Sequence, residues 1–157
     1  MAGLEDLYRE IILDHYRNPR NRGELPVPPA YRVEGFNPLC GDEIVVYLDV
    51  EDGRITDVRI GGQGCSISQS SASMMSAAVK NKSVAEARAL IRAFKAMMSI
   101  HEQRLDGEDG PAEERDPNVK LGDLEALQGV VKFPVRIKCA TLSWNTLAQG
   151  LDESATN

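Results

Sequence analysis

The sequence has few aromatic residues, no run of basic residues and no long apolar segment. Aromatic side chains make up 5% of its 157 residues, and the formal net charge is −6. Such a chain lacks the basic, base-stacking surface that nucleic acid requires. No apolar run approaches the roughly 20 residues of a membrane span, and the first residues lack the apolar core of a signal peptide. We therefore expect a cytoplasmic protein that binds neither nucleic acid nor membrane.

Cysteine and histidine are also scarce, with three and two copies in the chain. An odd number of cysteines in a cytosolic protein favours buried thiols, metal ligands or reactive groups over disulfides. The histidines lack the spacing of paired metal ligands and lie beside charged or polar neighbours. We therefore expect His15 and His101 to be solvated surface residues.

The length and composition fit one globular domain. At 42% hydrophobic and 27% charged, the chain can bury a substantial core. Residues 106–118 are acidic and rich in glycine and proline, which predicts an exposed loop. We assign residues 1–151 to a single domain and residues 152–157 to a disordered tail.

Three segments are expected to form strands. In residues 43–50 every second residue is aliphatic, which indicates a strand with one buried face. Asp52 and Gly53 accept the positive φ angles of a type I′ turn, so a hairpin should join this strand to the next. The expected strands, antiparallel in one sheet, span residues 31–35, 43–50 and 55–60.

Helices are predicted where apolar residues recur every three or four positions. The segment 66–80 is rich in serine and could be a flexible linker, but it lacks glycine and proline, so we favour a tightly packed helix. Ser83 and Glu86 form a capping-box pattern before a long amphipathic segment. With the sheet these helices make an α+β fold. They span residues 4–17, 66–80, 84–105 and a C-terminal segment that includes residues 144–151.

Each cysteine lies at a turn or at a helix start. Cys65 lies at a glycine-to-helix junction, where unpaired N–H groups favour a thiolate. Cys40 lies in a turn, and Cys139 lies where a helical pattern begins. The hairpin could bring Cys40 and Cys65 to one end of the sheet, whereas only the fold can place Cys139. The strand before Cys65 is expected to break at Gly61, Gly62 and Gly64.

Three thiolates and one carboxylate suit a tetrahedral zinc site, because soft sulfur ligands select zinc or iron–sulfur clusters. One glycine separates Cys40 from Asp42, so both side chains can point at one metal. Zinc with four anionic ligands leaves a net negative charge, which Arg136 and Lys138 are placed to offset. The alternative is that each cysteine is a buried, inert thiol. The candidate ligands are Cys40, Asp42, Cys65 and Cys139.

Three motifs carry a family resemblance: Asn-Pro-Leu-Cys-Gly-Asp at residues 37–42, Gly-Cys-Ser-Ile-Ser at 64–68 and Phe-Pro-Val-Arg-Ile-Lys-Cys-Ala at 133–140. Together they resemble the iron–sulfur cluster assembly proteins of the IscU/SufU (NifU N-terminal) type. The resemblance implies a three-stranded antiparallel sheet, helices packed on one face and the cysteines at one exposed end. It also implies that Cys40, Asp42, Cys65 and Cys139 are the family's metal or cluster ligands.

The resemblance further implies a task. A cysteine desulfurase would make a persulfide, a cysteine of this chain would accept the sulfur, and a downstream cluster carrier or apo-protein would receive the product. Cys40 and Cys139 are the acceptors that the resemblance implies. Lys138 stands where the IscU branch has histidine, and residues 133–137 differ from that branch's Leu-Pro-Pro-Val-Lys chaperone motif. With the extra segment at residues 105–120, the chain is more similar to the SufU branch, which implies tightly bound zinc.

The sequence supports three hypotheses about function. The first is a zinc-bound sulfur acceptor that stimulates a cysteine desulfurase, a sulfurtransferase-type role. The second is a non-enzymatic scaffold on which a [2Fe–2S] or [4Fe–4S] cluster is built and passed on. The third is a structural zinc domain for protein contacts. The oligomeric state stays open.

Overall fold

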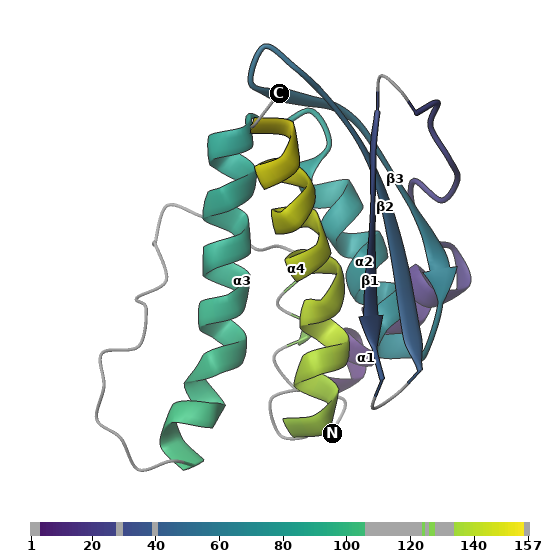
Figure 1. Ribbon diagram of the computed structural model, residues 1–157. Helices are drawn as coiled ribbons and strands as arrows, with labels where there is room; N and C mark the ends of the chain where they lie inside the picture. Colours follow the sequence, from purple (N-terminus) through teal and green to yellow (C-terminus); the bar gives the residue numbers. More distant parts are fainter. Residues whose placement is uncertain are drawn as a thin grey trace.

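The computed structural model describes residues 4–27, 30–38, 41–105, 124, 126–127 and 134–155. Helices pack on one face of a sheet and form a second layer (Figure 1). This arrangement confirms the predicted α+β fold. The elements are α1 (Leu4–Arg17), β1 (Tyr31–Asn37), β2 (Asp42–Glu51), β3 (Arg54–Gln63), α2 (Ser66–Val79), α3 (Val84–Leu105) and α4 (Pro134–Ala155).

The sheet is antiparallel, with the order β1-β2-β3. At one end the hairpin between β2 and β3 turns at Asp52 (φ 52°) and Gly53 (φ 75°), as the type I′ prediction requires. At the other end Asn37, the last residue of β1, lies opposite Asp42, the first residue of β2. Asp42 lies at this second end, close to Cys65 and Cys139.

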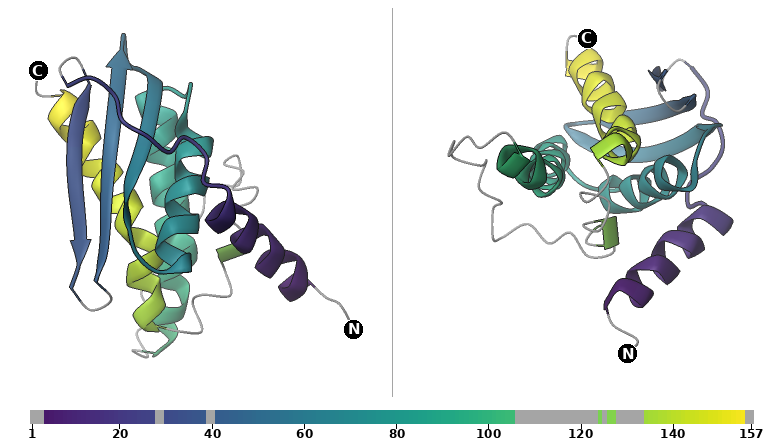
Figure 2. Two further views of the ribbon diagram at one scale, coloured as in Figure 1. Left: turned by 90° about the vertical axis from the view of Figure 1, so that its right-hand side faces the viewer. Right: turned by 90° about the horizontal axis from the view of Figure 1, so that it is seen from below.

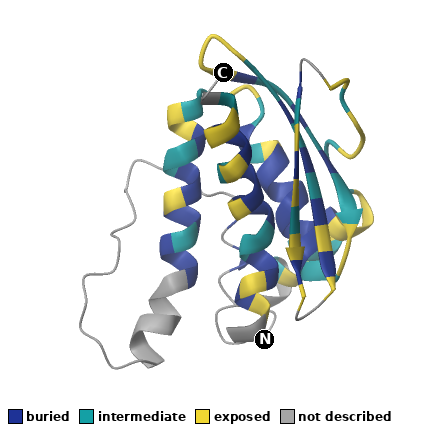
Figure 3. Cartoon of the chain, viewed as in Figure 1, coloured by how far each residue is buried: buried dark blue, intermediate teal, exposed yellow. Residues whose placement is uncertain are grey.

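Helices α2 and α4 cover the inner face of the sheet, while α1 packs on α2 and α3 packs on α4 (Figure 2). Aliphatic side chains of the strands meet the helices in one core. In Figure 3 the buried residues, in dark blue, lie on the strands and on the helices packed against them. Trp144 of α4 stacks on Phe94 of α3, with ring centroids 4.6 Å apart. The close packing fixes α4, and therefore Cys139, relative to the sheet.

The serine-rich segment is a buried helix rather than a linker, as predicted. Its small side chains let neighbouring backbone come close, and their hydroxyls find partners there. Ser71 Oγ donates to the carbonyl of Ala140 and accepts a hydrogen bond from Trp144 Nε1 at 3.1 Å. Helix α2 is thus tied to α4 one residue after Cys139.

The structure corrects the histidine prediction. His15 is 3% exposed, and its Nδ1 lies 2.8 Å from Ser73 Oγ of α2. The polar serines of α2 provide a buried partner that helical periodicity alone does not reveal. The side chain of His101 and the predicted loop at 106–118 lie outside the described residues.

Two predicted boundaries are also wrong. Strand β3 continues past Gly61 and Gly62 to Gln63, because these glycines still pair with β2. Helix α4 begins at Pro134, a residue whose fixed φ and missing N–H suit the first helical position. It continues to Ala155, so residues 152–155, assigned to a disordered tail, are helical. None of the described helices is long and apolar enough to span a membrane.

Candidate metal centre

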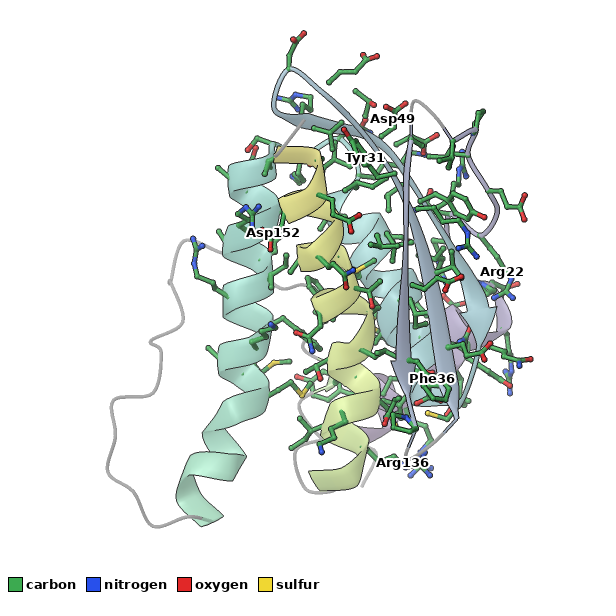
Figure 4. All side chains as sticks on the ribbon, viewed as in Figure 1. Arg22, Tyr31, Phe36, Asp49, Arg136 and Asp152 are labelled. Carbon is green, nitrogen blue, oxygen red and sulfur yellow. The ribbon has the colours of Figure 1, made fainter. Side chains whose placement is uncertain are left out.

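Asp42, Cys65 and Cys139 converge at the end of the sheet opposite the hairpin. Their ligand atoms (one carboxylate oxygen and two sulfurs) all lie within 4.8 Å of one another. They come from the first residue of β2, the residue before α2 and the second turn of α4. Phe36 and Arg136, labelled in Figure 4, lie at the same end of the molecule.

Asp42 and Cys65 are held together by a backbone hydrogen bond. The N–H of Cys65 donates to Asp42 Oδ1 at 2.9 Å, while Cys65 Sγ lies 3.9 Å from Asp42 Oδ2. Asp42 is fully buried, and its carboxylate satisfies one of the N–H groups at the start of α2. One oxygen therefore orients the cysteine and the other faces its sulfur.

Gly64 makes this approach possible. A Cβ at residue 64 would collide with Asp42 Oδ1 and would lie 2.6 Å from Ser68 Oγ. Its φ is not positive, so the requirement is for space rather than for an unusual backbone conformation. The glycine that precedes Cys65 is thus a packing feature of the site.

Cys139 reaches the site through the packing of α4 across β1. A Cβ at Gly35 would collide with Thr146 Oγ1 and lie 3.2 Å from Leu142, so the missing side chain lets the helix lie close to the strand. Cys139 has no exposed surface, and the side chain of Asn37 approaches it, with Nδ2 3.9 Å from Sγ. Cys139 lies within the helix, whereas the sequence placed it where the helix begins.

The three groups fit a zinc ion. Tetrahedral zinc with Zn–S of about 2.3 Å and Zn–O of about 2.0–2.2 Å places neighbouring ligand atoms about 3.5–3.8 Å apart. The observed 3.9 Å between the Cys65 sulfur and the Asp42 oxygen is close to this spacing. Two sulfurs and one carboxylate are also the donor set that zinc accepts. Bound zinc would keep the thiols deprotonated.

The other predicted site residues stand as follows. Cys40 lies outside the described residues, so its role as the fourth ligand stays a prediction. Of its described neighbours, Gly41 has φ 69° and donates its N–H to the carbonyl of Asn37 at 2.9 Å. Arg136 and Lys138 are exposed on the first turns of α4. Their role in balancing charge also stays a prediction.

The sequence reasoning missed Asn37. It is 6% exposed and occupies the position that continues the inward-facing row of Val33 and Gly35 along β1. The predicted strand ended at residue 35, whereas β1 continues to Asn37, so this residue was not recognised as an inward-facing position that needs a buried polar partner.

The fold and the convergent carboxylate and thiols define a small α+β domain with a cluster of aspartate and cysteine side chains that could hold a metal ion at one end of its sheet. The chain matches the family model of the NifU-like N-terminal domain over residues 7–140. It belongs to this family.

Several relatives match nearly the whole chain. The zinc-dependent sulfurtransferase SufU of Bacillus subtilis is 44% identical over 150 residues, which are 96% of this chain and 92% of the relative. The iron–sulfur cluster assembly scaffold protein IscU of Streptococcus pyogenes is 38% identical, covering 99% of this chain and 89% of the relative. The crystal structure of a protein described as a putative iron–sulfur cluster assembly scaffold for the SUF system, from Fervidobacterium islandicum, has a TM-score of 0.71 at 33% identity and covers 95% of this chain and 99% of that chain.

Proposed function

We propose that this chain is a zinc-bound sulfur acceptor in cytoplasmic iron–sulfur cluster assembly and that it takes sulfur from a cysteine desulfurase. The observation that carries the proposal is the convergence of Asp42, Cys65 and Cys139 within 4.8 Å. The similarity to a protein named zinc-dependent sulfurtransferase, over 96% of this chain, supports it. Cys40 completes the proposed ligand set.

The transfer itself needs no net oxidation. A thiolate of this chain attacks the terminal sulfur of the desulfurase persulfide, the S–S bond breaks, and the desulfurase cysteine leaves as a thiolate. Cys40 and Cys139 are the two candidate acceptors. Since Cys139 has no exposed surface, a persulfide reaches it only after the groups around it separate.

Asp42 is the ligand that we expect to exchange. A carboxylate is a weaker partner for zinc than a thiolate, and Asp42 already accepts the N–H of Cys65 through its other oxygen. Loss of its contact with the metal would leave that hydrogen bond in place. The site could then open without unfolding the start of α2.

The test is desulfurase turnover, measured with and without this chain, with zinc quantified on the same preparation. The zinc-loaded chain should accelerate sulfide or persulfide production, and the zinc-free chain, checked by circular dichroism for an intact fold, should not. No stimulation by a folded, zinc-loaded chain contradicts the proposal and favours a purely structural zinc domain.

A second candidate function is a scaffold for an iron–sulfur cluster held by the same residues. The 38% identity to a protein named as an assembly scaffold, over 99% of this chain, favours it. Anaerobic reconstitution with iron and sulfide separates the two roles. A scaffold should develop stable visible absorption bands in stoichiometric yield, whereas a zinc-bound acceptor should retain zinc and stay colourless.

A further inference from the structure

The two cysteines of the described site have different surroundings. Cys65 is partly exposed, and its sulfur faces the Asp42 carboxylate. Cys139 is fully buried, and the Asn37 side-chain amide approaches its sulfur at 3.9 Å. Asn37 comes from β1, 102 residues away in sequence, and lies opposite Asp42 in the sheet register. The strand that borders Asp42 therefore also supplies an amide to the other cysteine.

The chemistry determines which end of the amide faces the sulfur. A metal-bound cysteine sulfur carries negative charge and accepts hydrogen bonds, and the amide NH₂ is the end that donates. An amide oxygen turned toward the sulfur would place two electron-rich atoms together in a buried site. The polar side chain at this inward position is thus placed to donate to the Cys139 sulfur.

We propose that Asn37 is a positioning residue, which donates a hydrogen bond to the Cys139 sulfur and keeps that sulfur a permanent ligand of the metal. Sulfur exchange is then directed away from Cys139. The inference rests on the proposed zinc-bound acceptor and assigns an unequal role to its cysteines. Partners that orient metal ligands typically contribute about 10- to 100-fold to metal affinity.

Two substitutions test the role of the donor. Asn37→Leu keeps the approximate volume but removes the donor, and Asn37→Asp keeps the shape but presents only acceptors. Zinc affinity, measured by competition with a chromophoric chelator, should fall about 10-fold for Asn37→Leu and toward 100-fold for Asn37→Asp. Asn18→Asp, an exposed asparagine at the end of α1, makes the same change in charge outside the site and should leave the affinity unchanged.

Cobalt substitution separates positioning from mere folding. Loss of a hydrogen bond to sulfur raises the energy of its lone pairs, so the sulfur-to-cobalt charge-transfer band of Asn37→Leu should move to longer wavelength. If Asn37 only stabilised the fold, its substitution would lower the melting temperature of the metal-free protein and leave this band in place. Unchanged affinity and an unchanged band in Asn37→Leu would overturn the proposal, even if Asn37→Asp does not fold.

These measurements use no desulfurase, so their outcome is independent of the turnover assay. Failure of the wild-type chain to stimulate a desulfurase refutes the proposed function. Failure of the Asn37 variants to alter metal affinity and the cobalt spectrum refutes the positioning role.

Discussion

The candidate metal centre has two halves that are built in different ways. Asp42 and Cys65 are 23 residues apart, lie at the ends of one hairpin and are joined by a backbone hydrogen bond. Cys139 and Asn37 are 102 residues apart and meet only because α4 packs across β1. The first half is local, and the second depends on the whole core.

This difference predicts which substitutions should disrupt each half. A local pair held by a hydrogen bond should respond to changes in its immediate surroundings. A pair held by helix–sheet packing should respond to changes anywhere along the interface, and its disruption should also cost stability.

Removal of a thiol ligand should have the largest effect. Cys65→Ala and Cys139→Ala should each lower zinc affinity by more than the roughly 100-fold that loss of an orienting partner can cost. Chelator competition on folded protein measures this. Because Asn37 is proposed to keep the Cys139 sulfur on the metal, any loss of sulfur acceptance in Cys139→Ala should parallel its loss of zinc. Full metal content and full activity in both variants would rule out the assigned site.

Asp42→Cys tests the exchangeable ligand in the local half. A thiolate in place of the carboxylate should bind zinc at least about tenfold more tightly, or about 1.4 kcal/mol, while sulfur acceptance falls. Zinc affinity and desulfurase turnover are measured on the same preparation. Sulfur transfer at the wild-type rate would show that the carboxylate does not control opening of the site.

Two glycine substitutions compare the halves directly. Gly35→Ala forces a methyl group against Thr146 and should destabilise the α4–β1 interface, at the upper end of the roughly 1–3 kcal/mol typical of overpacking. Gly64→Ala forces a methyl group against Asp42 and should lower the unfolding free energy less than Gly35→Ala does. The ratio of lost zinc-binding free energy to lost unfolding free energy should therefore be larger for Gly64→Ala. Urea unfolding of the metal-free protein and chelator competition give both quantities. Equal ratios in the two variants would mean that the halves are not distinct.

The smallest effect on zinc affinity is expected from a substitution at the start of α3, at the opposite end of the sheet from the site. Ser83 Oγ accepts the N–H of Glu86 at 3.0 Å, and the Ser83 N–H donates to Glu86 Oε1 at 3.3 Å, so the predicted capping box is confirmed. Ser83→Ala should cost about 1 kcal/mol of unfolding free energy. Zinc affinity should be unchanged, because α3 starts beside the hairpin turn, where Val84 N donates to the carbonyl of Gly53. A changed affinity would show that the two ends of the sheet are coupled.

The same contact predicts a pH dependence. The hydrogen bonds from the backbone and side chain of Ser83 lower the pKa of Glu86 from its ordinary value of 4.5. The charged form is favoured in the folded state, so the stabilisation is present above pH 4.5 and is lost as the pH falls through the folded-state pKa. Glu86→Gln should remove the contribution of this carboxylate to the pH dependence of stability, which acid-unfolding curves recorded by circular dichroism measure. Identical curves for wild type and variant would contradict it.

Local pattern was sufficient for most of the fold. The alternation of aliphatic residues predicted the strands, and Asp52 and Gly53 predicted the hairpin. The absence of glycine and proline favoured a helix for the segment that forms α2. Gly61 and Gly62 were misread because a glycine can break a strand or continue it, and the pairing with β2 decides which. The burial of His15 depended on Ser73, a partner 58 residues away.

The part of the site that could be predicted is the part whose residues are close together in the sequence. The spacing around the hairpin placed Asp42 near Cys65, but no local signal placed Cys139, which needed the family resemblance. Asn37 escaped notice because an amide in a strand suggests no chemistry until its partner is known. Residues joined by tertiary packing are those that a single sequence reveals least.

The most direct test of the central claim is the zinc X-ray absorption spectrum of the purified, zinc-loaded chain. Convergence of Cys40, Asp42, Cys65 and Cys139 on one ion predicts three sulfurs at about 2.3 Å and one oxygen at about 2.0–2.2 Å, with one sulfur fewer in Cys139→Ala. Zinc coordinated by fewer than three sulfurs in the wild-type chain, or by the same number of sulfurs in both proteins, would contradict it.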